Sequence, residues 1–265
     1  MAKRVISGII LTVVSMGSMA IGGNILLVLL FLSSCIGFYE LFKTTEKAEF
    51  NNKLDVVRVV GVLGIIGYYI MIFLKIDRIY LTIPIIVTLF LILLMYVFTY
   101  PKYHINQITM AFFSFFYVTV MLSFVYFIRQ LEQGFPIIWL ILIVSWWCDT
   151  CAFTAGKTMG KHKLVEKLSP KKTIEGFIGG VLGAAFLGGA LAYVFLQDTY
   201  NVWYIVLISI ICAVISQLGD LVASAVKRNY NIKDFGNVIP GHGGIMDRFD
   251  SMIFVAPVLY FLLII

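Results

Sequence analysis

Apolar residues run through this 265-residue chain in long stretches with almost no charge, and short polar connectors separate the stretches. A helix needs about 20 apolar residues to cross a bilayer. The first run, from Val5 to Tyr39, is too long for one helix, and Gly22-Gly23-Asn24 offers a turn inside it. The pattern predicts nine membrane-spanning helices, at residues 5–22, 25–42, 56–75, 79–99, 107–128, 136–155, 174–196, 202–226 and 248–265. The predicted fold class is therefore an all-α polytopic membrane protein.

The composition agrees with this class and removes others. Hydrophobic residues make up 61% of the chain, charged residues make up 13%, and the mean hydropathy is +0.98. A chain so poor in charge cannot cover itself with polar surface, which excludes a soluble enzyme, a disordered protein and a nucleic-acid-binding module. The apolar runs are continuous rather than alternating, which argues against a transmembrane barrel. The four cysteines lie in apolar segments and predict no disulfide framework.

The basic residues predict an orientation for the helices. With nine spans and a cytoplasmic N-terminus, 17 of the 20 lysines and arginines fall on the cytoplasmic side. Only Lys75, Arg78 and Arg129 then fall on the far side. This excess follows the positive-inside rule. We therefore expect the two longest loops, residues 156–173 and 227–247, in the cytoplasm.

The chain is expected to divide into two regions. Residues 1–135 hold about five of the predicted spans and no motif that suggests chemistry. Residues 136–265 hold the other spans and both long loops, so we expect catalysis there.

Acidic residues inside the predicted spans are the sharpest functional signal, because a charge near the bilayer centre costs several kcal/mol. Asp149 and Asp220 lie within spans, and Asp247 and Asp250 open the last one. Asp220, Ser224 and Lys227 follow an i, i+4, i+7 spacing and share one helix face. A carboxylate cluster of this kind suits Mg²⁺, which takes one or two carboxylates together with substrate phosphates. Interfacial acids or buried hydrogen-bonding groups are the alternative.

The last loop combines basic residues with a glycine-rich turn. Residues 240–244 read Pro-Gly-His-Gly-Gly, and a helix is predicted just after them. Free backbone N–H groups at a helix start favour an anion such as phosphate. Nearby positive charge comes from Lys227, Arg228, Lys233 and Arg248. The loop therefore predicts a metal–phosphate site, with a solvated basic loop as the alternative.

The other loop leads into the span at 174–196. Ser169 is predicted to cap this helix and Pro170 to be its first residue. Lys171 and Lys172 would then lie in the first turn, where cations are unfavourable unless an anion is near. A bound phosphate would resolve this conflict, and an ordinary topological role is the alternative. The glycines at 176, 179, 180 and 183 predict close helix packing.

The run from Ser224 to Asp250 resembles the signature of the phosphatidate cytidylyltransferase (CDP-diacylglycerol synthase) family. The matching elements are Ser224, Lys227-Arg228, Lys233-Asp234, the Pro240-x-His242-Gly243-Gly244 turn and Asp247-Arg248-x-Asp250. Further resemblance lies in Asp149, Ala152, Phe153, Gly156, Gly160 and the run from Ser169 to Gly176. Phe153 stands where the family commonly has Tyr.

The resemblance implies a reaction of CTP with phosphatidate that gives CDP-diacylglycerol and pyrophosphate. It implies Mg²⁺ as cofactor, with a second cation left open, and a multi-pass protein of the inner (plasma) membrane whose active site faces the cytoplasm. CTP, phosphatidate and membrane lipid are the expected partners, nucleic acid is not, and a homodimer is left open.

The resemblance also implies roles for individual residues. Asp220, Asp247 and Asp149 are expected to bind metal, with Asp149 in a further or supporting position. The catalytic set is expected to be Asp220, Asp247, Lys227, Arg228 and Asp250. The substrate-binding set is expected to be Lys171, Lys172, Ser224, Lys233, Asp234, His242, Gly243, Gly244 and Arg248.

Two other functions stay open from the sequence. A CTP-dependent polyprenol or phytol kinase would use the same kind of site. A cation-coupled transporter would use Asp149 and Asp220, but it needs a polar path to the far face, and the polar residues gather on one side.

Overall fold

The computed structural model describes residues 2–45, 55–239, 241 and 243–264, with side chains from residue 6 onward. Most of these residues are helical, and a two-stranded antiparallel hairpin accompanies the helices. The predicted all-α membrane class is therefore confirmed.

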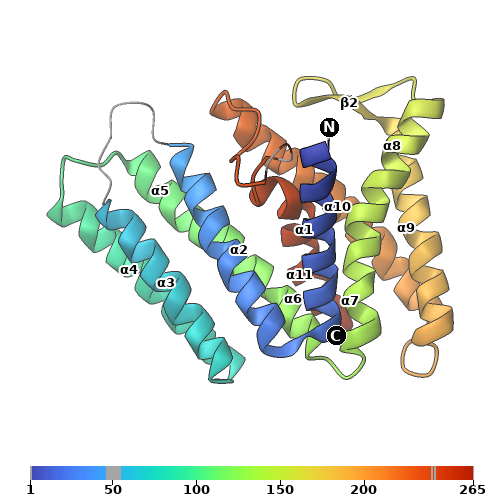
Figure 1. Cartoon of the computed structure of the whole chain (residues 1–265), viewed down its shortest axis with the longest axis horizontal. Coiled ribbons are helices and arrows are strands. Elements are labelled where there is room, and N and C mark those ends of the chain that lie inside the picture. Colours follow the sequence, from blue (N-terminus) through green and yellow to red (C-terminus); the bar gives the residue numbers. More distant parts are fainter. Residues whose placement is uncertain (1, 46–54, 240, 242, 265) are drawn as a thin grey trace. The chain divides into compact units, whose positions relative to one another are not determined.

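Contacts within the chain define two compact units. Figure 1 shows the whole chain, with colours that follow the sequence. The first unit joins Met1–Ser123 to Asp234–Asp247, and the second joins Phe124–Lys233 to Arg248–Ile265. We call Asp234–Asp247 the signature loop. It packs with the N-terminal helices, although its place in the sequence lies far into the region after residue 135.

The first unit is a set of apolar helices. Its elements are α1 (Ala2–Ile21), α2 (Gly23–Lys43), α3 (Val56–Phe73), η1 (Arg78–Leu81), α4 (Thr82–Phe98), α5 (Ile105–Ser114), η2 (Phe115–Val120) and the start of α6 (Met121–Arg129). Helix α2 lies beside α3 and α5, and α3 lies beside α4 (Figure 1). The predicted turn between the first two helices is confirmed: Gly22 and Gly23 have φ angles of 71° and 55°, which glycine adopts without strain.

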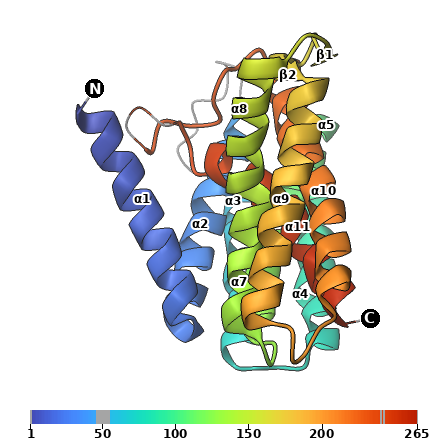
Figure 2. The ribbon, with the colours of Figure 1, turned by 90° about the vertical axis from the view of Figure 1, so that its right-hand side faces the viewer.

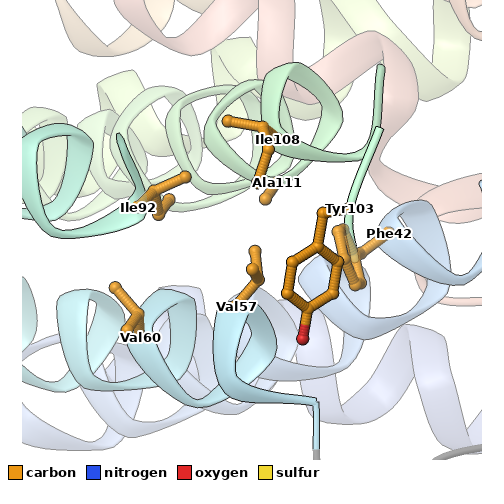
Figure 3. Close-up of a cluster of buried hydrophobic side chains, with 7 residues drawn as sticks. All are labelled: Phe42, Val57, Val60, Ile92, Tyr103, Ile108 and Ala111. Atoms are coloured by element: carbon orange, nitrogen blue, oxygen red, sulfur yellow. The ribbon is translucent and has the colours of Figure 1, made fainter. Parts of the chain in front are cut away.

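A cluster of buried side chains holds α2, α3, α4 and α5 together (Figure 3). Its members are Phe42, Val57, Val60, Ile92, Tyr103, Ile108 and Ala111. The Tyr103 hydroxyl donates a hydrogen bond of 2.5 Å to Asp55, whose side chain also accepts from the Val57 N–H and so caps α3. Burial, together with this bond to a carboxylate, raises the pKa of the Tyr103 phenol.

The second unit carries the remaining elements. They are α7 (Gly134–Leu142), η3 (Ile143–Trp147), α8 (Cys148–Met159), β1 (Lys163–Val165), β2 (Ser169–Thr173), α9 (Ile174–Phe195), α10 (Val202–Asn229) and α11 (Met246–Ile264), whose first two residues belong to the signature loop. Helices α8, α9 and α10 run side by side, and the hairpin of β1 and β2 lies at one end of α8 and α9 (Figure 2).

Glycines allow α9 to approach α8 closely, which confirms the packing predicted from their spacing. A Cβ atom at Gly176 would lie 2.7 Å from the Ala152 carbonyl oxygen, and one at Gly180 would lie 2.9 Å from that of Cys148. Both distances are too short for a real contact, so only glycine fits. This approach brings the end of α8 against the start of α9.

Seven helices among the described residues are long and apolar enough to cross a membrane. A shorter apolar helix covers Ile6–Ile21, and the last predicted span is the helix α11. Each of the nine predicted segments is helical to within a few residues, except that α8 runs to Met159. The number of nine crossings and the cytoplasmic N-terminus stay predictions.

Candidate active site

Three acidic side chains of the second unit are near enough to interact electrostatically. Asp149 lies on α8, Asp220 on α10, and Asp250 in the first turn of α11. Asp149 and Asp250 each interact electrostatically with Asp220. The helix crossing is close, because a Cβ at Gly219 would lie 3.1 Å from the Asp250 carbonyl oxygen. Ionised carboxylates this near to one another repel, so positive charge beside them stabilises the cluster.

Lysine supplies part of that balance. The Lys172 Nζ lies 2.5 Å from Oδ2 of Asp220 and donates a hydrogen bond of 3.5 Å to the Gln217 carbonyl oxygen. Lys172 also attracts Asp149, and Lys227 attracts Asp250. The cluster is thus a network of carboxylates and ammonium groups rather than a single isolated ion pair.

A cavity of about 470 Å³ opens beside the Lys172–Asp220 pair. We call it the α8–α10 pocket, because residues of α8, β1, β2, α9 and α10 line it. Its charged lining consists of Asp149, Lys157, Lys163, Lys171, Lys172 and Asp220. Several lysines facing one hollow favour a ligand with several negative charges, such as a polyphosphate.

Lys171 and Lys172 line this pocket from a different element than the one predicted. The predicted cap at Ser169 is wrong, because Ser169–Thr173 forms strand β2 and α9 begins at Ile174. Thr173 is the cap: its hydroxyl accepts a 3.1 Å hydrogen bond from the Gly176 N–H. Lys171 and Lys172 therefore lie on the strand before the helix, not in its first turn. The conflict with the helix dipole, which motivated a phosphate there, does not arise.

The carboxylates suit a divalent cation whose coordination is completed by water and by a substrate phosphate. Within the described ranges no group of three His, Cys, Asp or Glu side chains forms a ready metal cage. Mg²⁺ does not require one, since it usually takes one or two carboxylates, water and substrate phosphate. Asp149, Asp220 and Asp250 offer oxygen ligands of that kind, and their mutual repulsion favours a cation.

The signature loop of the first unit is held by hydrogen bonds from its own backbone. Oδ2 of Asp247 accepts from the Phe235 N–H at 2.9 Å and from the Gly244 N–H at 3.0 Å. Gly243 lies against Asp247 and Asp234, with a φ of 83° that favours glycine. The loop thus folds around the Asp247 carboxylate.

Glu40 is the residue that the sequence analysis missed. It lies on α2 and is 2% exposed, and its carboxylate accepts from the Ile245 N–H at 3.1 Å and from the Met246 N–H at 3.0 Å. The N–H groups of Gly244, Ile245 and Met246 are thus bonded to carboxylates, whereas the sequence analysis expected them to be free for phosphate. The signal that could have found Glu40 is an acidic residue near the end of an otherwise apolar span.

Comparison with known proteins gives this geometry a context. The sequence profile of the Cytidylyltransferase family matches residues 2–265. The chain belongs to the cytidylyltransferase family. It is 34% identical over 275 aligned residues to the phosphatidate cytidylyltransferase of Bacillus subtilis (strain 168), an alignment that covers 99% of this chain and 97% of the relative. It is 45% identical over 143 residues to the protein of the same name from Staphylococcus haemolyticus, across 54% of this chain and 55% of that relative.

Several predicted site residues of this family member lie at or near the end of α10. Ser224 and Lys227 are half-buried there, while Arg228 and Lys233 are exposed. The Nε atom of Arg248 is buried without a hydrogen-bond partner among the described residues. A buried guanidinium donor without a partner suits an anionic ligand.

Two predictions made from the sequence are not tested by these contacts. His242 falls outside the described residues. Asp220 and Asp247 belong to different units, so their shared metal site stays a prediction. Among the described residues, His162 is exposed, and its Nδ1 lies 2.7 Å from Oε1 of Glu175.

Proposed function

We propose that the chain is an integral-membrane phosphatidate cytidylyltransferase, which converts CTP and phosphatidate to CDP-diacylglycerol and pyrophosphate in phospholipid synthesis. Its membership in the family and its similarity to the Bacillus subtilis enzyme over nearly the whole chain support this reaction. The observation that carries the proposal is the α8–α10 pocket. It combines lysines for phosphate with carboxylates for a cation in a protein built from apolar helices.

The chemistry needs no nucleophile from the protein. An oxygen of the phosphatidate phosphate attacks the α-phosphorus of CTP, and the bond from that phosphorus to the pyrophosphate oxygen breaks. Pyrophosphate leaves with the electron pair. In such transfers, positioning and charge neutralisation supply most of the catalysis. We assign these tasks to Lys171 and Lys172 in the pocket, together with Lys227, Arg228 and Arg248.

A bound Mg²⁺ would neutralise phosphate charge in this site. Asp149, Asp220 and Asp250 are the proposed ligands in the second unit, and Asp247 of the signature loop is proposed to share the site with Asp220. The Lys172–Asp220 ion pair keeps these carboxylates partly balanced before substrates arrive. Lysine is suited to this exchange, since its ammonium group on a flexible stem can turn from a carboxylate to a phosphate.

The protein is a membrane protein, and we propose that its active site faces the cytoplasm from the plasma membrane. The excess of basic residues in the connectors assigned to one side supports this orientation. CTP is a cytoplasmic, water-soluble triphosphate, whereas phosphatidate stays in the bilayer. A pocket at one end of α8, α9 and α10 would let the two meet.

The test uses purified full-length protein in vesicles that contain phosphatidate, with CTP and Mg²⁺ in the medium. We expect mass spectrometry to find CDP-diacylglycerol, with one pyrophosphate released for each molecule formed. Removing Mg²⁺ with EDTA should stop both. Uptake of cations into the vesicles, without either product, would overturn the proposal in favour of a transporter.

A further inference from the structure

Glu40 is an acidic residue buried within a helix that is apolar on both sides of it. It lies three residues before the end of α2, with a side chain that is 2% exposed. Burial of a carboxylate costs several kcal/mol unless charge and hydrogen bonds compensate. Its acidic neighbour Asp247 repels it, so compensation must come from other groups.

The compensation comes from the start of α11. Both oxygens of Glu40 accept backbone N–H groups there: Oε1 from Ile245 and Oε2 from Met246. The first N–H groups of a helix have no partner within it, and the helix dipole places positive charge at that end. Glu40 therefore caps α11 from a position 205 to 206 residues earlier in the chain. Bonds of this kind, from N–H to an ionised acceptor, are about twice as strong as neutral ones.

The loop is shaped to receive this carboxylate. A Cβ atom at Gly236 or at Gly244 would overlap the Glu40 side chain. One turn earlier on α2, a Cβ at Gly37 would lie 2.8 Å from the Val118 side chain and in ordinary contact, at 3.4 Å, with the Met246 sulfur, so Met246 packs beside this turn of α2. Helix α2 and the signature loop thus fit each other at successive turns.

We propose that Glu40 is a positioning residue for cytidylyl transfer: it fixes the start of α11 and thereby the direction of the Asp247 carboxylate. Asp247 follows Met246 directly, so any movement of the Met246 N–H moves Asp247 as well. The second set of bonds, from the Phe235 and Gly244 N–H groups to Asp247, then closes the loop around it. The inference rests on the proposed function, in which the signature loop is part of the active site.

The first arm of the test measures the loop without any substrate. Ile239, which is 8% exposed in the signature loop, is changed to Cys in a protein that retains only Cys212 of the native cysteines. Cys212 is buried in α10 and reports opening of the second unit. Glu40→Gln keeps the shape of the side chain but puts an NH₂ where an acceptor was. We expect thiol labelling at position 239 to become about tenfold faster or more, with Cys212 unchanged.

The second arm measures kinetics on the wild-type cysteine background. Glu40→Gln should lower kcat about tenfold or more, while KM for CTP stays within about threefold, because Glu40 acts through the loop. In an Asp247→Asn background the same substitution should cost much less, since both act on one element. Glu132→Gln is the matched control: Glu132 is exposed in the α6–α7 connector, and neither labelling nor kcat should change.

Unchanged labelling at position 239 with unchanged kcat would overturn the proposal. The proposal would also be overturned if the double variant Glu40→Gln/Asp247→Asn lost kcat by the full product of the two single losses. Should Glu40→Gln fail to fold, Glu40→Asp keeps the charge and withdraws it by one methylene, and it should show a smaller change in both arms. Absence of CDP-diacylglycerol from the wild-type protein would instead reject the proposed function, while the labelling arm would still report whether Glu40 holds the loop.

Discussion

The α8–α10 pocket and the signature loop both contain carboxylates, but the two regions hold them in opposite ways. In the pocket, Asp220 is paired with a lysine side chain at 2.5 Å, beside a cavity of about 470 Å³. At the signature loop, Asp247 and the α2 residue Glu40 accept two backbone N–H groups of the loop each. A flexible ammonium group can be exchanged for a cation or a phosphate with little rearrangement. Backbone donors cannot be released unless the loop itself opens.

The difference separates carboxylates that act on ligands from carboxylates that build the site. Substitutions in the pocket should change how the enzyme uses CTP and Mg²⁺ while the loop stays closed. Substitutions at Glu40 should loosen the loop first and lower turnover as a consequence. Both regions contain acidic groups, so charge alone does not tell the two roles apart.

The largest effect is expected for Asp220→Asn, which removes a negative charge from the pocket and nearly keeps the shape. We expect kcat to fall a hundredfold or more, on the order of 3 kcal/mol, as when a charge-stabilising group is lost. The Mg²⁺ concentration for half-maximal activity should rise. Thiol labelling at Ile239→Cys should not change. Faster labelling at that position would break the distinction between the two regions.

Asp247→Asn should lower kcat about as much as Asp220→Asn does. Combining the two substitutions sharpens the comparison between the pocket and the signature loop. If both residues hold one cation, the double variant should be little worse than either single variant. Kinetic assays across a range of Mg²⁺ concentrations check this. Strictly multiplicative losses with unchanged Mg²⁺ dependence would reject a shared cation and leave Asp247 as a loop residue only.

A smaller loss is expected for Lys172→Ala, which removes the partner of Asp220. We predict a fall in kcat/KM of about tenfold or more, since each 1.4 kcal/mol of lost stabilisation is a factor of ten. Lys167→Ala is the matched control, because Lys167 is exposed at the tip of the same hairpin and does not line the pocket. Equal kinetics for the two variants would assign Lys172 to membrane topology alone.

The smallest effect is expected at Thr173, the cap of α9. Thr173→Val keeps the shape but removes the acceptor for the Gly176 N–H. The free energy of unfolding should fall by about 1 kcal/mol, the usual cost of a lost helix cap. Thermal unfolding in detergent measures it, and Thr173→Ser should retain most of the stability. A loss confined to kcat, with unchanged stability, would contradict the capping role.

The sequence predicted the helices well because membrane helices leave a strong local signal. Each predicted apolar segment forms a helix, and the glycines of α9 pack as their spacing suggested. The hairpin was missed because Ser169-Pro170 is also a typical helix start, and Thr173, the real cap, lies four residues later. Two local patterns competed there, and pairing of β1 with β2 decided between them.

The site was predictable only in part. The pattern identified Asp149, Asp220, Asp250 and Lys172, which the fold brings together. Glu40 could not be connected to the signature loop, because the contact spans 205 residues and no local pattern encodes it. For the same reason the sequence could not show that the N–H groups at the start of α11 are bonded to carboxylates.

One measurement tests the central claim, transfer of a cytidylyl group to a lipid phosphate, most directly. Purified protein is incubated with phosphatidate vesicles, Mg²⁺ and CTP that carries ³²P at either the α- or the γ-phosphate, with Asp220→Asn as the inactive comparison. We predict that the α-label enters the lipid phase, that the γ-label stays in water as pyrophosphate, and that the Asp220→Asn protein labels neither lipid nor pyrophosphate appreciably. Transfer of the γ-label to lipid would contradict the account and identify a CTP-dependent lipid kinase.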